Sequence, residues 1–185
     1  MTKVGTAVEK AVQTVRQGGL IIYPTEAVYG LGGDYRQAEV VSNILALKHR
    51  PISQGLILVA GHIGHILPLI QPLSGSDLAA ALATWPGHHT WIFPASDKVP
   101  AGVRGPDNTV AVRLSAHPVI IDLCQQLNHA LISTSANKRG QATPTVLQQL
   151  VSQWPHEVDY FLDLPLGHAQ KPSTIRIAGD GHTVR

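Results

Sequence analysis

The spacing of hydrophobic residues alternates along the chain between a period typical of helices and one typical of strands. Apolar residues recur three or four positions apart over residues 4–15 and predict an opening helix, which Gly18-Gly19 ends. The same spacing predicts helices at residues 41–48, 63–70, 77–84, 119–127 and 145–154. Ser76 is the expected N-cap of the helix at 77–84, and Pro118 starts the helix at 119–127.

Short apolar runs between these helices predict strands, at residues 20–23, 56–60, 90–93, 109–114, 131–134, 160–162 and 174–177. Because proline has no N–H to donate, the first strand should end at Pro24. Residues 25–34 then form a glycine-rich loop. Helices and strands alternate without a linker, so we expect one α/β layered domain over residues 1–185.

The composition narrows the class of protein. Of 185 residues, 44% are hydrophobic and 14% charged, with a net charge of +2, which excludes a disordered chain and a charge-laced coiled coil. The single cysteine, Cys124, cannot form an internal disulfide, and its apolar surroundings predict a small buried side chain. Neither residues 1–18 nor the apolar run at 56–70 fits a signal peptide or membrane span, so we expect a soluble, cytoplasmic protein.

Several well-known catalytic and binding motifs are absent from the sequence. No glycine is followed by the Lys-Ser or Lys-Thr of a P-loop, and Tyr35 occupies the third glycine position after Gly30 and Gly32, so a Rossmann fingerprint fails. The ten histidines show no HExxH spacing, no CxxC occurs, and the GxSxG elbow of hydrolases is missing.

Polar residues gather instead where the apolar pattern stops, at residues 23–34, 48–51, 85–90, 110–114, 133–137 and 171–174. Several of these segments follow strands, and strand ends line the ligand crevice of α/β sheets. Some also have structural explanations: cations at a helix C-terminus gain about 0.3–1 kcal/mol, and residues 133–137 suit a capped turn. Arg113 is harder to explain, because a guanidinium on a half-buried strand needs an anionic partner.

The order of the motifs favours one interpretation. Pro-Thr-Glu at residues 24–26, Lys-x-Arg at 48–50 and Ser-x-Asn at 135–137 follow one another, and over nearly the whole chain they resemble the YrdC family in its short bacterial form. The resemblance implies a single YrdC-like α/β (α+β) domain with a twisted mixed sheet flanked by helices and a concave basic cleft. It also implies an enzyme, a nucleotidyltransferase that makes L-threonylcarbamoyladenylate from L-threonine, bicarbonate or CO2, and ATP, releasing pyrophosphate. That product serves N6-threonylcarbamoyladenosine modification of tRNA.

By motif position, the resemblance also assigns roles to residues. The expected ATP-binding residues are Lys48, Arg50, Thr90, Ser135, Asn137 and Thr143, of which Lys48 and Arg50 stabilise charge without any protein nucleophile. The expected threonine-binding residues are Thr25, Arg113, Ser133 and Ser173. Mg2+ should arrive with ATP, because magnesium is usually held by substrate phosphates. Further expected partners are tRNA or double-stranded RNA and a downstream threonylcarbamoyl-transferase complex, with no membrane.

Two departures from the family pattern leave questions open. His88-His89 replace a commoner Pro-hydrophobic pair, which puts the shape of the adenine or threonine wall in doubt. Lys138-Arg139 replace a frequent Leu-Ser pair and add two cations beside the phosphate site, able to strengthen triphosphate binding or to face RNA.

Two alternative functions compete with the enzyme. A non-catalytic double-stranded RNA or tRNA-binding module would use the same basic concave face, and a pI of 8.8 fits it, although the charge surplus is small. A carbamoyl-transfer domain of a larger maturation protein is disfavoured, because no acylphosphatase-like or zinc-finger segment accompanies it.

Overall fold

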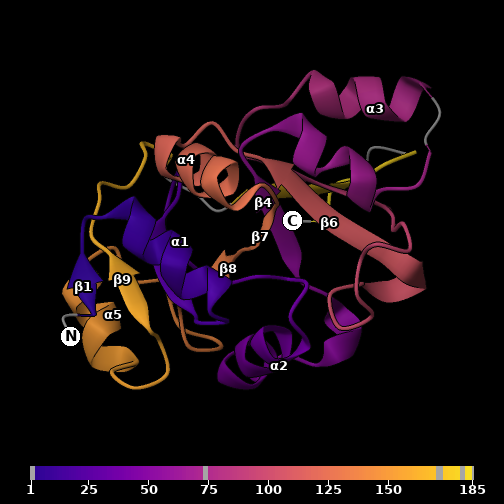
Figure 1. The fold of residues 1–185 in the computed structure, drawn as a ribbon. Helices are drawn as coiled ribbons and strands as arrows, with labels where there is room; N and C mark the ends of the chain where they lie inside the picture. The colour runs from indigo at the N-terminus through magenta and orange to yellow at the C-terminus, as the bar shows by residue number, and fades with distance from the viewer. Residues whose placement is uncertain (1–2, 73–74, 170–172, 180–181, 185) are drawn as a thin grey trace.

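The computed structural model describes residues 3–72, 75–169, 173–179 and 182–184, which form two mixed β-sheets with helices packed on them (Figure 1). The first sheet contains β1 (Val4–Gly5), β2 (Ile21–Pro24), β3 (Tyr29–Gly32), β8 (Thr134–Ser135) and β9 (Tyr160–Leu162). The second contains β4 (Ile57–Ala60), β5 (His89–Pro94), β6 (Thr109–Leu114), β7 (Leu131–Ile132) and β10 (Thr174–Ile177). The strand orders are β1-β9-β2-β3-β8 and β10-β5-β6-β4-β7, so the expectation of one sheet is wrong.

The longer helices are α1 (Val8–Arg16), α2 (Ala38–Leu47), α3 (Gly75–Leu82), α4 (Pro118–Leu127) and α5 (Leu147–Gln153). Short 3-10 turns are η1 (Ile52–Gln54), η2 (Ile63–His65), η3 (Leu67–Leu69) and η4 (Pro106–Asn108). Within the described part of the chain, no helix has the length and apolarity needed to cross a membrane.

Most predicted helices are confirmed, and three details are wrong. Val4 belongs to a strand that pairs with Phe161, so the first helix begins later than expected. Residues 63–70 form two 3-10 turns, because Pro68 lacks the N–H that a continuous helix needs. Ser76 lies inside α3, which begins at Gly75, so it is not the N-cap.

The predicted glycine-rich loop at residues 25–34 contains a strand. β3 runs antiparallel to β2, with Ile21 opposite Gly32. A Cβ atom on Gly32 would lie 1.9 Å from the carbonyl oxygen of Ile132. Glycine at this position therefore permits two backbones to approach closely, and does not mark a flexible loop.

The chain crosses from one sheet to the other at Ser133. β7, before it, pairs with β4 of the second sheet, and β8, after it, pairs with β3 of the first. The backbone N–H of Ser133 donates to the carbonyl oxygen of Ile57 at 2.8 Å. The single strand predicted at 131–134 is therefore wrong, because its pairing partner changes in the middle.

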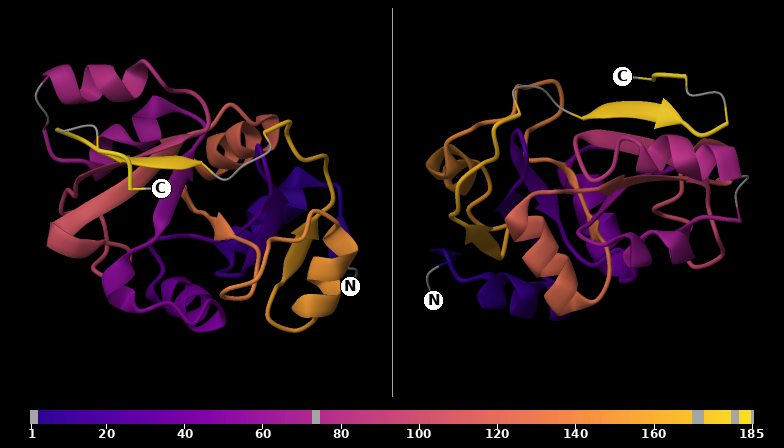
Figure 2. Two further views of the ribbon diagram at one scale, coloured as in Figure 1. Left: turned by 180° about the vertical axis from the view of Figure 1, so that it is seen from behind. Right: turned by 90° about the horizontal axis from the view of Figure 1, so that it is seen from above.

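Alternate residues of the central strands enter two hydrophobic clusters. In β2, Ile21 packs with α1 and α4, whereas Ile22 joins the cluster that includes Ile44 of α2. Figure 1 shows α1 and α4 side by side, and Figure 2 shows β1 and β10, the edge strands of the two sheets, on opposite sides of the molecule. Cys124 of α4 is fully buried, as expected, and burial raises the pKa of its thiol to about 12.

Candidate active site

A cleft of about 500 Å³ lies where the two sheets meet. The turn between β2 and β3 forms one wall, and the first sheet contributes Gly30 of β3. Ile57 and Arg113 come from the second sheet. The crossing segment at residues 133–137 closes the wall between them. A ligand in this cleft therefore contacts both sheets.

Eight of the ten expected site residues line this one cleft, although they come from six separate segments of the chain. These eight are Thr25, Arg50, Arg113, Ser133, Ser135, Asn137, Thr143 and Ser173. The fold thus brings together residues up to 148 positions apart, from Thr25 to Ser173. Their individual roles stay predictions.

Thr90, the ninth expected residue, lies behind the cleft wall. It is fully buried on β5, and its hydroxyl oxygen lies 3.0 Å from that of Ser173. Because β5 pairs with β10, this contact holds the segment before β10 against the cleft. In this arrangement Thr90 supports Ser173 and does not face the cleft.

Lys48, the tenth, lies in a smaller neighbouring pocket of about 180 Å³. It caps the C-terminal end of α2, as the sequence predicts, and its ammonium group reaches across to the crossing segment. The Nζ atom donates to the carbonyl oxygens of Ser135 and Asn137 and, at 2.8 Å, to Oδ1 of Asn137. Burial and the nearby Arg50 guanidinium lower the pKa of Lys48 to about 8.

Arg50 and Asn137 are both held by hydrogen bonds within the protein. The Arg50 guanidinium donates to the carbonyl oxygens of Gly55 and Gln54, at 2.7 and 3.0 Å. Asn137 Oδ1 accepts from the Ser135 hydroxyl at 2.7 Å, which fixes the amide orientation. These contacts pre-position polar groups along one side of the cleft.

Glu26 is the functional candidate that the sequence analysis missed. Its carboxylate lies 3.2 Å from Nη2 of Arg113 and accepts a 2.6 Å hydrogen bond from the Ser115 hydroxyl. Burial raises the pKa of Glu26, but the Arg113 guanidinium and the Ser115 hydroxyl outweigh it and hold that pKa below its ordinary value. The anionic partner that Arg113 requires is therefore present in the protein itself. The sequence signal that could have revealed Glu26 is its place in Pro-Thr-Glu, directly after Thr25.

Thr25 closes the turn between β2 and β3. Its hydroxyl donates to the carbonyl oxygen of Val28 at 2.7 Å, and its backbone N–H donates to the same oxygen at 3.2 Å. A Cβ atom on Gly30 would approach both Thr25 and Ser133, so the missing side chain keeps the cleft open at this point.

The two departures from the family pattern lie in different places. His88 lines the cleft, whereas His89 turns to β10, where its Nδ1 lies 2.8 Å from the Thr174 hydroxyl oxygen. Arg139 lines the smaller pocket and donates to the carbonyl oxygen of His49 at 2.8 Å. Lys171, in the polar segment at 171–174, lies outside the described residues.

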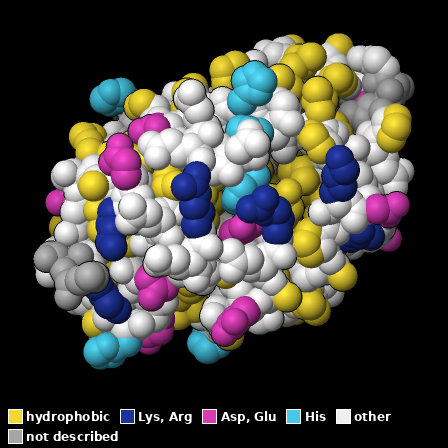
Figure 3. All heavy atoms as spheres, viewed as in Figure 1, with side chains coloured by type: hydrophobic (Ala, Val, Ile, Leu, Met, Phe, Trp, Pro, Cys, Tyr) yellow, Lys and Arg dark blue, Asp and Glu magenta, His cyan; other side chains and the backbone are white. Residues whose placement is uncertain are grey.

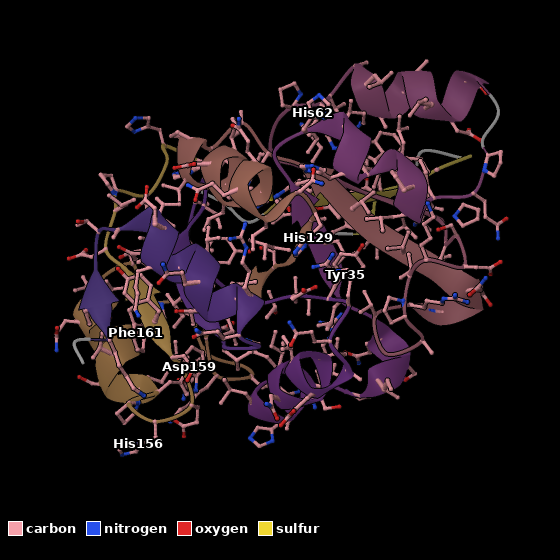
Figure 4. All side chains as sticks on the ribbon, viewed as in Figure 1. Tyr35, His62, His129, His156, Asp159 and Phe161 are labelled. Atoms are coloured by element: carbon pink, nitrogen blue, oxygen red, sulfur yellow. The ribbon has the colours of Figure 1, made fainter. Side chains whose placement is uncertain are left out.

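A second group of buried polar residues lies away from the cleft. The carboxylate of Asp34 accepts two hydrogen bonds from the Arg36 side chain, and His129 Nε2 lies 3.7 Å from its Oδ2. Tyr35 contacts the His129 ring edge-on, with ring centres 6.0 Å apart (Figure 4). Among the described residues, no group of three or more His, Cys, Asp or Glu side chains is placed to hold a metal ion.

The charge of the cleft is mixed. Arg50 and Arg113 both line it, but Glu26 pairs with the second. On the face shown in Figure 3, Lys and Arg side chains are dispersed among acidic and histidine side chains and do not form one patch. A basic concave cleft therefore stays a prediction.

Comparison with known proteins identifies the family. The family model Sua5/YciO/YrdC, which carries the description "Telomere recombination", matches residues 13–184. The chain belongs to this YrdC/Sua5 family.

Two similar relatives bear the name threonylcarbamoyl-AMP synthase. The synthase of Coxiella burnetii is 40% identical over 179 residues, which cover 97% of this chain and 96% of that protein. The synthase of Xylella fastidiosa strain M12 is 43% identical over 179 residues, covering 95% of each chain.

Solved structures share the fold. The crystal structure of P. abyssi Sua5 complexed with L-threonine matches with a TM-score of 0.87 and 27% identity over 95% of this chain, which spans 52% of that one. E. coli YciO matches with a TM-score of 0.85 over 98% of this chain and 90% of its own, and at 22% identity that likeness concerns the fold alone.

Proposed function

We propose that this protein is a threonylcarbamoyl-AMP synthase, which condenses L-threonine, bicarbonate or CO2, and ATP into L-threonylcarbamoyladenylate and releases pyrophosphate. The observation that carries the proposal is the single cleft that collects polar residues from six segments of the chain. Relatives of the same length, 40–43% identical, carry this activity in their names. The product supplies N6-threonylcarbamoyladenosine in tRNA.

The reaction needs alignment more than a protein nucleophile. The threonine amine first adds to CO2, loses a proton to solvent and forms a carbamate. A carbamate oxygen then attacks the α-phosphorus of ATP, the bond from that phosphorus to the bridging oxygen breaks, and its electron pair leaves with pyrophosphate. Such an in-line displacement is accelerated by positioning and charge neutralisation, which hydroxyls and cations supply.

Arg113 is the proposed clamp for the threonine carboxylate. Its guanidinium lines the cleft, and its Nε atom is buried without a hydrogen-bond partner among the described residues. Glu26 holds the guanidinium by one terminal nitrogen, so the planar fork is oriented before substrate binds. Thr25, Ser133 and Ser173 offer hydroxyls on the same cleft, suited to the polar groups of threonine.

The nucleotide takes the other side of the cleft. Ser135, Asn137 and Thr143 offer polar contacts there, and Arg50 neutralises phosphate charge. Lys48 orders the crossing segment from behind. Mg2+ accompanies the triphosphate, because magnesium usually keeps water and phosphate ligands. Thr90 acts through Ser173.

Further partners follow from the reaction. The adenylate is a reactive mixed anhydride, so a threonylcarbamoyl-transferase complex has to receive it and transfer the group to tRNA. We place this chemistry in the cytoplasm, where ATP, bicarbonate and tRNA meet. Direct contact between this chain and tRNA stays a separate prediction.

The test is a pyrophosphate-release assay with ATP, bicarbonate and Mg2+, in which each amino acid is added in turn. Threonine should support the fastest release, with threonylcarbamoyl-AMP detected by mass spectrometry. Arg113→Gln should raise the KM for threonine by about tenfold or more, since a charge-assisted pair is lost. Lys10→Gln, on the exposed side of α1, is the matched control and should behave as wild type. Binding of RNA without threonine-dependent pyrophosphate release would instead favour the RNA-binding module.

A further inference from the structure

A small pocket beside the main cleft gathers three cations. Its volume is about 180 Å³, and Lys48, Arg50 and Arg139 line it together with Ser135 and Asn137. Arg50, Ser135 and Asn137 also line the main cleft. Because the two spaces share these residues, they adjoin, and an elongated ligand in the cleft can reach the small pocket.

Lys48 and Arg50 each make several hydrogen bonds within the protein. The Lys48 ammonium makes three hydrogen bonds to Ser135 and Asn137, and an ammonium has three N–H groups. The Arg50 guanidinium donates to Gly55 and Gln54. Both cations contribute positive charge to the pocket, but many of their donors are engaged within the protein.

Arg139 is placed differently. Its side chain is exposed, and its one hydrogen bond to a described residue runs from Nη1 to the carbonyl oxygen of His49, at 2.8 Å. That carbonyl follows the end of α2, so the bond holds the guanidinium over the small pocket. A guanidinium has five N–H donors, which suffices for this bond and for a bidentate contact to a phosphate.

We propose that Arg139 binds the terminal phosphates of ATP and the pyrophosphate that leaves them. The identity of the nucleotide rests on the proposed function, whereas the pyrophosphate subsite rests on the pocket. As the bond to the α-phosphorus breaks, negative charge grows on the departing diphosphate, so a cation here stabilises the transition state more than bound ATP. Arg139 is then a substrate-contacting residue, in addition to those expected from the motifs.

The neighbouring Lys138 supplies a matched control. It is exposed, carries the same charge and precedes Arg139 in the chain. Both residues line a neighbouring groove beside Gln153 and Trp154, but only Arg139 also lines the small pocket. A purely general attraction of polyanions to this loop would involve both residues equally, whereas a subsite involves Arg139.

The experiment compares the affinities of inorganic pyrophosphate, ATP and AMP for wild type, Arg139→Gln and Lys138→Gln, by calorimetry with Mg2+ at fixed salt. Glutamine at position 139 keeps a polar amide and removes the positive charge together with the guanidinium fork. Arg139→Gln should weaken pyrophosphate and ATP by about tenfold or more and leave AMP within about twofold. Lys138→Gln should change all three by less than about threefold, and Arg139→Lys should recover part of the loss.

Three results would overturn the subsite: unchanged pyrophosphate affinity in Arg139→Gln, an equal loss in Lys138→Gln, or an equal loss of AMP, which would indicate a disturbed loop. Synthase activity of wild type is measured separately. An inactive wild type that binds pyrophosphate through Arg139 contradicts the proposed function and supports the subsite. An active wild type whose product inhibition by pyrophosphate does not depend on Arg139 supports the proposed function and contradicts the subsite.

Discussion

The protonation of Lys48 should couple ATP binding to pH. Its pKa is lowered from an ordinary 10.5 to about 8 by burial and by the neighbouring Arg50. Near pH 8 a large share of the unliganded protein therefore carries a neutral lysine in the pocket. Triphosphate binding brings negative charge beside the amine and favours the ammonium form, so ATP binding should take up a proton.

The size of this effect follows from the pKa values. If bound phosphates restore the ordinary pKa of 10.5, about half a proton is taken up at pH 8 and roughly 0.9 at pH 9. The same linkage predicts that ATP affinity falls about fivefold between pH 8 and pH 9. ATP itself does not titrate between pH 8 and pH 9, and Arg50 stays charged, so neither contributes.

The assay is calorimetry of ATP binding at pH 8 and pH 9, in pairs of buffers that differ in ionisation enthalpy. The slope of the binding enthalpy against the buffer enthalpy gives the number of protons taken up. Lys48→Met keeps much of the side-chain volume and removes the titrating group, so its slope should be close to zero. Equal slopes for wild type and Lys48→Met, or a flat affinity from pH 8 to pH 9, would refute the coupling.

Three further predictions concern stability and reactivity. Gly32→Ala should lower the unfolding free energy by about 3 kcal/mol or more in urea titrations, because its Cβ would meet a backbone carbonyl oxygen at 1.9 Å. Gly75→Ala is the control and should not destabilise the protein, since the space around Gly75 is open. The unfolding free energy should also fall as the pH drops below 6.5. His117 and His129 have lowered pKa values in the folded protein, so the unfolded chain takes up protons first. A urea midpoint that stays flat between about pH 7.5 and pH 5.5 would contradict this. Cys124 should resist thiol reagents in the native protein and react fully in denaturant, since it is buried and its pKa is raised to about 12; rapid native labelling would show that α4 opens.

The fold was predictable wherever the signal is local. The helices α2 and α4 carry a clear apolar face. The end of α2 at Lys48 and the start of α4 at Pro118 follow from propensity and proline geometry. The division into two sheets was not predictable, because strand partners lie far apart in sequence and no local pattern at Ser133 marks a crossing between sheets. β3 was missed for a related reason: its glycines indicate a loop until the carbonyl oxygen of Ile132 is seen beside Gly32.

The site was predictable in its residue types more than in its contacts. Ordered motifs pointed to residues that the fold gathers around one cleft, but they did not show that Lys48 faces a side pocket or that Thr90 lies behind Ser173. The need of Arg113 for an anionic partner was recognised from its strand, yet Glu26 was missed, because the pairing depends on how two sheets are placed in space.

The crossing at Ser133 has a consequence for how ligands affect the whole molecule. The two sheets are joined there by a single residue, and the cleft beside it has walls from both sheets. A bound nucleotide or amino acid therefore acts as a non-covalent cross-link, and its binding free energy opposes separation of the sheets as well as local opening. Amide hydrogen exchange in β7 and β8 should slow together when the cleft is filled, although these strands belong to different sheets.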